Sequence, residues 1–112
     1  IKDRDENGQM DFALPKGRLP KGFVCNCDLA AVMLIEKLRE KNIRVPDDLY
    51  VSGFDDNHEF NNRITLTSVH VNTEHIGTHL ANRIVYRLMH PEDDYEYTYI
   101  RSRTIYREST ND

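Results

Sequence analysis

Two aspartates, Asp28 and Asp55, stand directly after short apolar runs and are the residues best placed to do chemistry. The runs, 23–27 and 49–54, are typical of buried β-strands. In an open parallel sheet, ligands bind beyond the carboxyl ends of the strands, and neighbouring strands lie about 4.8 Å apart. We therefore expect these strand ends to converge on one small polar ligand. The predicted binding residues are Asn26, Cys27, Asp28 and Asp55.

The chemistry of a carboxylate limits what such a site would hold. A carboxylate that accepts two hydrogen bonds suits adjacent hydroxyls, a base edge or an amine, and it repels phosphate. Asp28 also fits a structural role, because a carboxylate at the start of a helix can accept from its first free N–H groups. Both interpretations stand for Asp28 at this point, and Asp55 is a candidate for ligand binding by its position alone.

The elements that must position these aspartates form a strand–helix–strand unit. Strong helix formers fill residues 29–41, and the helix is expected to end at Asn42, which tolerates a left-handed backbone, before Pro46. A helix between two strands at this spacing makes a right-handed parallel unit. The predicted fold class is therefore α/β, with a parallel sheet flanked by helices.

The second half of the chain predicts a third strand, a long helix and a further β-prone run. Residues 57–63 are typical of a short helical turn or loop, residues 65–71 alternate as a strand does, and Asn72 is suited to cap the helix that follows. Residues 95–107 are expected to form a long strand with tyrosines and arginines on one face. The helix carries one apolar stripe that something must cover. The stripe consists of Ile76, Leu80, Ile84 and Leu88.

Length and composition bound the function. A chain of 112 residues makes one small domain. Its net charge is -4 and its basic residues are scattered, so we do not expect the chain itself to bind DNA. It has neither a membrane-spanning apolar run nor a signal-peptide pattern, which predicts a cytoplasmic protein. The chain opens without Met on a charged run, which is typical of a piece of a longer protein.

Several other residues could hold a metal, but none does so convincingly. Residues 3–11 imitate the start of a calcium loop, yet Leu14 stands where a bidentate Glu is required. His75 and His79 are one helical turn apart without a third ligand, which favours a solvated helix face. Cys25 and Cys27 share one side of a predicted strand, and we expect buried free thiols there. The sequence therefore predicts no metal and no cofactor.

Two other function classes compete with ligand sensing. The pair Asp55 and Asp56 is also typical of magnesium-dependent phosphoryl-transfer enzymes, but no phosphate-cradling glycine loop or positioned Lys accompanies it. The tyrosines and arginines of residues 95–107 could stack on and neutralise a single-stranded nucleic acid, although an edge strand explains them equally well and the net charge is acidic. Neither class carries a catalytic or binding motif.

The order of several motifs resembles the transcription regulators of the lac-repressor (LacI/GalR) type. That family has a strand followed by an Asp-x-x-Ala helix, then "R-V-P-D-D", "V-x-G-F-D-D", "L-T-T-V" and a terminal "R-E-S". The corresponding segments are 24–31, 44–48, 51–56, 65–69 and 107–109, and the resemblance extends over residues 23–110. This sequence departs from the pattern at Cys27, where Asn is usual, at Asn42, where Gly is common, and at Val71, where a polar effector contact is frequent.

The resemblance implies the carboxyl-terminal part of a periplasmic-binding-protein-like (type I) effector domain, and not an enzyme. Residues 1–22 would be a loop-rich lead-in, 23–110 a partial effector-binding domain and 111–112 a tail. It implies a small effector such as a sugar, a homodimer, and DNA binding through a headpiece that this chain lacks. Asp55 corresponds to the family's ligand-binding aspartate. The helix after residue 72 would pack in a second subdomain, so its stripe should seek a partner or repack.

Overall fold

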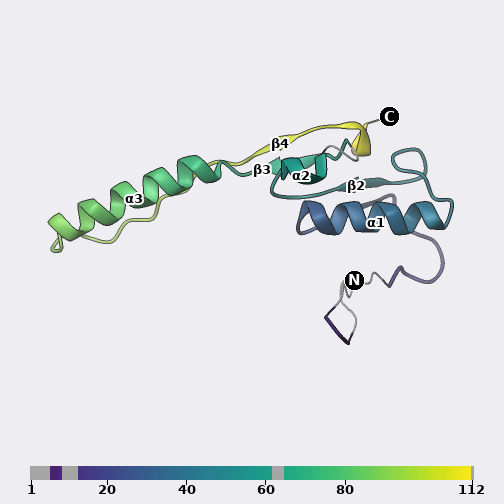
Figure 1. The fold of residues 1–112 in the computed structure, drawn as a ribbon, viewed down its shortest axis with the longest axis horizontal. Helices are drawn as coiled ribbons and strands as arrows, with labels where there is room; N and C mark the ends of the chain where they lie inside the picture. The colour runs from purple at the N-terminus through teal and green to yellow at the C-terminus, as the bar shows by residue number, and fades with distance from the viewer. Residues whose placement is uncertain (1–5, 9–12, 62–64, 112) are drawn as a thin grey trace. The chain divides into compact units, whose positions relative to one another are not determined.

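The computed structural model describes residues 6–8, 13–61 and 65–111 (Figure 1). These residues belong to two compact units, Ile1–His70 with Thr104–Asp112 (unit 1) and Val71–Arg103 (unit 2). The aspartates of the calcium-like pattern, the end of the 57–63 segment and the last residue of the predicted tail lie outside the described residues.

Unit 1 contains the predicted strand–helix–strand unit. β1 (Gly22–Val24) and β2 (Tyr50–Ser52) pair in parallel, with Phe23 opposite Val51. α1 (Asp28–Glu40) connects them and lies along the strands (Figure 1). The predicted parallel α/β arrangement is confirmed, but both strands are shorter than expected. After Ser52 the backbone also bonds on its other side, since the Gly53 N–H donates to the carbonyl of Thr67 at 2.9 Å.

The third predicted strand belongs to a second two-stranded sheet, and isolated parallel bridges join it and Thr67 to the end of β2. β3 (Ser68–His70) continues from parallel bridges that join Ser52 to Thr67 and Asp55 to His70. β3 also pairs with β4 (Arg103–Ile105). The remaining short elements are α2 (His58–Asn61), which fits the predicted helical turn, and the 3-10 turn η1 (Glu108–Thr110).

The core of unit 1 lies between α1 and the strands. Leu34 and Leu38 on α1 are 2% and 0% exposed, and Val51 and Leu66 are fully buried beside them. Burying side chains of this kind stabilises a fold by roughly 1.5–3 kcal/mol each. The buried apolar cluster consists of Ala30, Ala31, Val32, Leu34, Leu38, Leu49, Val51 and Leu66.

The two ends of α1 differ in how well the sequence predicts them. At the carboxyl end Asn42 adopts φ 59°, as expected, and its N–H donates to Arg39 while that of Ile43 donates to Leu38. This pair of bonds is the Schellman motif, which satisfies the last helical carbonyls. The predicted cap at the other end is wrong, because the helix begins at Asp28 itself and Cys27 is the cap residue, without a side-chain bond.

Unit 2 is built around α3 (Thr73–Met89), whose start agrees with the sequence. The side chain of Asn72 accepts from the His75 N–H at 2.9 Å, which confirms the predicted cap. None of the helix's residues is buried, and the apolar stripe ranges from 38% exposed at Ile76 to 78% at Leu88. The amphipathic pattern therefore predicts the helix correctly, while its apolar face has no cover within the described residues.

The long strand predicted for residues 95–107 is wrong for most of its length. Only Arg103–Ile105 is a strand, and the alternating Tyr95, Tyr97 and Tyr99 are 90%, 90% and 91% exposed. A strand needs a neighbouring backbone to satisfy its N–H and C=O groups, and residues 95–102 have none among the described residues. This segment is joined to α3 by side chains instead, with Arg87 lying over the ring of Tyr95.

Candidate functional site

The predicted binding residues lie on neighbouring strand ends, which a backbone hydrogen bond joins. The Asp28 N–H donates to the Phe54 carbonyl at 2.9 Å, which fixes the start of α1 against the end of β2. Asn26 and Asp55 are exposed, Cys27 is half-buried and Asp28 is buried. The structure therefore brings the two strand ends together, but Asp55 is exposed to solvent whereas Asp28 is buried.

Asp28 has an internal role in this arrangement. Its side chain is buried, with the residue 1% exposed. One carboxylate oxygen accepts from the Asn57 N–H at 2.7 Å and the other accepts from the Ser68 hydroxyl at 2.5 Å. A buried carboxylate requires such partners, because leaving it unpaired is costly. Asp28 thus ties α1 to the turn after β2 and to β3, which explains why it does not cap its own helix.

The turn after β2 has an unusual backbone. Asp55 has φ 95° and Asp56 has φ 53°, a region that residues other than glycine seldom adopt. Conformations of this kind cost on the order of 1–3 kcal/mol each and persist only where the surroundings hold them. The Asp55 N–H donates to the Val69 carbonyl at 3.0 Å, and the Asp56 N–H to the Ser68 hydroxyl at 3.0 Å. The turn presents Asp55 to solvent and directs Asp56 inward.

Asp56 is the centre of an ion-pair cluster. Its side chain is 5% exposed and pairs with the Arg107 guanidinium at 2.7 Å. Its second oxygen lies 3.0 Å from Nδ1 of His70 on β3. Arg107 also donates to the Leu66 carbonyl at 2.7 Å, so one planar guanidinium holds two partners. This cluster was not predicted from the sequence, although the second aspartate after β2 and the arginine before η1 were the available signals.

The carboxylate of Asp55 differs from its neighbours. No hydrogen bond or ion pair from any described residue engages it, whereas the carboxylates of Asp28 and Asp56 are both engaged. It therefore keeps its full capacity to accept hydrogen bonds from a ligand. The Asp55 carboxylate is exposed and unengaged, and its turn is held in place by bonds to β3. This arrangement is the one expected of a ligand-binding group.

The two cysteines are free thiols. Burial raises the pKa of the Cys25 thiol to about 11, and the nearby Cys27 contributes to this rise. A raised pKa keeps a thiol protonated at neutral pH, where it is a poor nucleophile and metal ligand. The prediction of free thiols is confirmed, although both side chains are half-buried and not fully buried.

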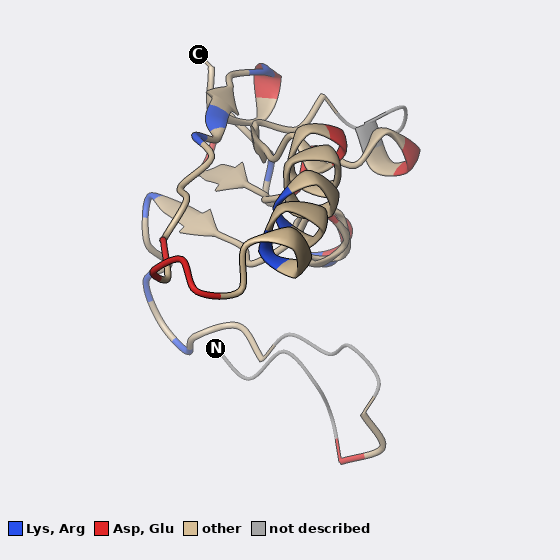
Figure 2. Ribbon diagram, turned by 90° about the vertical axis from the view of Figure 1, so that its left-hand side faces the viewer, with Lys and Arg blue, Asp and Glu red and all other residues tan. Residues whose placement is uncertain are grey.

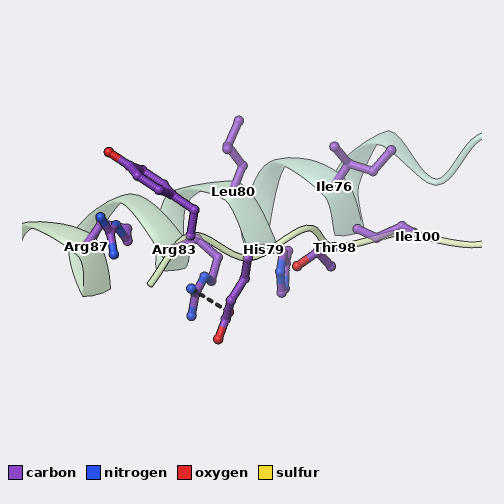
Figure 3. Close-up of a pocket in the computed structure, with 9 residues that line it drawn as sticks. Ile76, His79, Leu80, Arg83, Arg87, Thr98 and Ile100 are labelled. Carbon is purple, nitrogen blue, oxygen red and sulfur yellow. Dashed lines mark ion pairs between the residues drawn. The ribbon is translucent and has the colours of Figure 1, made fainter. Parts of the chain in front are cut away.

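Unit 2 contains a groove. It has a volume of about 450 Å³ and lies between α3 and residues 95–100 (Figure 3). Two of its charged groups engage each other, since Arg83 pairs with Glu96 at 2.7 Å. Among the described residues, Nε2 of His79 is shielded from solvent and has no hydrogen-bond partner. Ile76 and Leu80 of the apolar stripe and Ile100 supply apolar lining, and Arg87 and Thr98 are further polar lining residues.

Charge and hydropathy add no further candidate site within the described residues. Figure 2 shows the Lys and Arg positions dispersed among Asp and Glu along the described chain. Within that part of the chain, no cluster of three or more His, Cys, Asp or Glu side chains could bind a metal ion. The helices of the described ranges are all too short or too polar to span a membrane.

Comparison with known proteins gives one consistent family. A model of the periplasmic binding protein-like domain matches residues 2–110. A curated relative is the HTH-type transcriptional repressor PurR of Haemophilus influenzae, with 31% identity over 85 residues, 75% of this chain and 25% of the relative. The chain thus spans about a quarter of the length of that relative.

Solved structures agree with this match. The transcriptional regulator CelR in complex with cellobiose has a TM-score of 0.72 and 26% identity, over 80% of this chain and 28% of CelR. The lac repressor dimer bound to operator and the anti-inducer ONPF has a TM-score of 0.74 over 81% of this chain and 32% of its own. At 21% identity, that second likeness is one of fold. The curated relative named above is a transcriptional repressor and not an enzyme.

Proposed function

We propose, from the premise that this chain belongs to the periplasmic binding protein-like domain family and to its LacI-type transcriptional regulators, that it senses a small polar effector. The effector-binding part would be residues 23–110, preceded by a lead-in of residues 1–22 and followed by a tail of residues 111–112. The effector class that we propose is a carbohydrate. The solved structure of CelR, which is 26% identical to this chain, is a complex with cellobiose.

The observation that carries the proposal is the exposed carboxylate of Asp55 at the end of β2. It is unengaged by the described residues, and it lies on a turn whose backbone is held by β3. Adjacent sugar hydroxyls are suitable donors to such a group. The exposed Asn26 and half-buried Cys27 lie on the neighbouring strand end and complete the proposed site, while Asp28 supports it from within.

The regulator would act on DNA through a separate headpiece, as a cytoplasmic homodimer. The dispersed charges in Figure 2 support this division, because phosphate backbones are bound by gathered positive charge. The dimer is proposed from the exposed stripe of α3 and from the dimeric state of the lac repressor in its structure. An apolar face of this kind is usually covered by another chain or domain.

The competing functions have less support. Magnesium-dependent phosphoryl transfer would use Asp55 and Asp56 together, but the Asp56 carboxylate is engaged by Arg107 and His70. Binding of single-stranded nucleic acid would use the exposed tyrosines of residues 95–99, yet the net charge of -4 opposes it. Neither function is that of the repressor that this chain resembles.

The test of the proposed function is the loss of effector binding in Asp55→Asn. The natural chain that contains these residues would be titrated calorimetrically with mono- and disaccharides, including cellobiose, and with nucleobases as a second probe class. The substitution keeps the size of the side chain and removes its charge. We expect affinity for the sugar that binds to fall about tenfold to a hundredfold, since hydrogen bonds to charged groups contribute roughly 1.5–3 kcal/mol.

The matched control is Glu36→Gln, which removes an exposed carboxylate from the middle of α1 by the same chemistry. Its affinity should equal that of the unsubstituted protein. Binding that survives Asp55→Asn unchanged would remove Asp55 from the site. A protein that binds nucleobases and no sugar would contradict the proposed carbohydrate class.

A further inference from the structure

Two consecutive residues with positive φ must be held by something, and the structure identifies the anchor. The N–H groups of residues 55, 56 and 57 all donate to fixed partners, namely the Val69 carbonyl, the Ser68 hydroxyl and the Asp28 carboxylate. These bonds hold the backbone of the turn on the side of α1 and β3. They do not involve the side chain of Asp56, which needs restraints of its own.

Arg107 supplies that restraint from a distant part of the sequence. It is 51 residues away from Asp56 and bonds to its carboxylate at 2.7 Å, while its other terminal nitrogen is bonded to the Leu66 carbonyl at 2.7 Å. The Arg107 N–H also donates to the Thr67 hydroxyl at 2.7 Å, so backbone and side chain are both fixed to the segment before β3. A guanidinium held at several points is a rigid partner for a carboxylate.

His70 closes the cluster on the opposite oxygen of Asp56. Its side chain is 31% exposed, whereas the Asp56 side chain is 5% exposed. Asp56 is therefore held between one permanent cation and one imidazole. Because residues 55 and 56 are adjacent, restraining Asp56 also restrains the backbone from which the Asp55 side chain extends.

We propose that Arg107 and Asp56 are positioning residues for the effector site, which hold Asp55 in the orientation that a ligand meets. The role of these residues in ligand binding rests on the proposed function. Their restraint of the turn rests on the geometry alone. Neither residue would contact the effector. Both act through the backbone of the turn, which the cluster keeps in a conformation that aspartate adopts only under restraint.

The experiment uses Arg107→Lys in the natural chain that contains these residues. Lysine keeps the charge and much of the length but cannot bond to Asp56 and Leu66 with one planar group. Amide hydrogen exchange of residues 55 and 56, measured without ligand, reports on the turn. Exchange of the Leu34 and Leu38 amides in α1 reports on the stability of the whole unit.

The expected result is a local one. Exchange at residues 55 and 56 should rise about tenfold or more relative to exchange in α1, in keeping with the loss of one charged hydrogen bond. Affinity for the sugar that the unsubstituted protein binds should fall by a similar factor. In an Asp56→Asn background the same substitution should have little further effect, because the two residues act as one unit.

The matched control is Arg44→Lys. Arg44 also bonds to an aspartate with two nitrogens, at 3.1 and 2.9 Å from Asp48, but on the exposed surface of unit 1. This variant should change neither the exchange at residues 55 and 56 nor the affinity. The control therefore distinguishes the effect of losing any arginine–aspartate pair from the effect of losing the pair of Arg107 with Asp56.

The outcomes separate this inference from the proposed function. Exchange at residues 55 and 56 that rises only in proportion to exchange in α1 would overturn it, because Arg107 would then be merely structural. A local rise with unchanged affinity would also overturn it. If the unsubstituted protein binds no probe, the proposed function fails, and a local rise in exchange still supports the positioning of the turn by Arg107.

Discussion

α1 and α3 are both amphipathic helices, yet the structure uses their apolar faces in opposite ways. Six residues of α1 are buried, whereas none of α3 is. Leu38 on α1 is fully buried and Leu88 on α3 is 78% exposed. The difference does not lie in the pattern along either helix. It lies in whether strands of the same unit are available to cover the face, as β1 and β2 are for α1.

The first way to test this comparison is to truncate one leucine on each helix. Leu38→Ala should destabilise unit 1 by about 2–5 kcal/mol, because it removes buried methyl groups and leaves a cavity. Leu88→Ala should change the stability by less than about 0.5 kcal/mol, as surface substitutions do. Urea unfolding of this 112-residue chain, followed by amide exchange in each helix, measures both. A large effect at Leu88 would show that the face of α3 is covered in solution.

The second way compares the polar groups at the starts of the two helices. Asp28→Ala should cost about 3 kcal/mol, since it leaves the buried Ser68 hydroxyl and Asn57 N–H without an acceptor. Asn72→Ala removes a solvent-exposed cap and should cost about 1 kcal/mol, detected as faster exchange in the first turn of α3. Equal effects would contradict the assignment of Asp28 to an internal network.

The third way uses one glycine from each unit. A Cβ at Gly53 would lie 2.2 Å from Oδ1 of Asp28 and 2.9 Å from Cδ2 of Leu66, so Gly53→Ala should destabilise by roughly 1–3 kcal/mol through overpacking. A Cβ at Gly77 meets nothing within 4 Å. Gly77→Ala should therefore stabilise α3 by roughly 0.5–1 kcal/mol through helix propensity.

The sign of the stability change in Gly77→Ala tests whether the face of α3 is open. Thermal unfolding of the chain should show the gain if the helix face is open. A loss of stability in the natural chain that contains these residues, together with a gain in the 112-residue chain, would locate a closely packed partner at Gly77. A loss in both would contradict an open face on α3.

The sequence predicted the local features of the fold well, because these depend on neighbouring residues. Asn42 ends α1 with a left-handed backbone, and Asn72 caps α3 through its side chain, both as expected. Predictions failed where the outcome depends on distant residues. The alternation of residues 95–107 favours a strand, but a strand forms only where another backbone pairs with it, and here that holds for Arg103–Ile105.

The candidate site was predictable in position but not in roles. Two aspartates after parallel strands correctly locate the edge of the sheet where Asp28 and Asp55 lie. That Asp28 is buried follows from Ser68 and Asn57, which are 40 and 29 residues away in the sequence. The engagement of Asp56 likewise depends on Arg107. No local pattern reports which carboxylate a distant arginine will bind.

Ser109 has a consequence for how the protein is made. Its hydroxyl donates to the carbonyl of Val51 and accepts from the N–H of Thr67, residues 58 and 42 positions earlier in the chain. At a translation rate of roughly 5–20 residues per second, Ser109 is synthesised on the order of 3–12 seconds after Val51 of β2, to which it bonds. During that interval the Val51 carbonyl lacks the hydroxyl donor, and the Thr67 N–H lacks the hydroxyl acceptor, that Ser109 supplies in the folded protein.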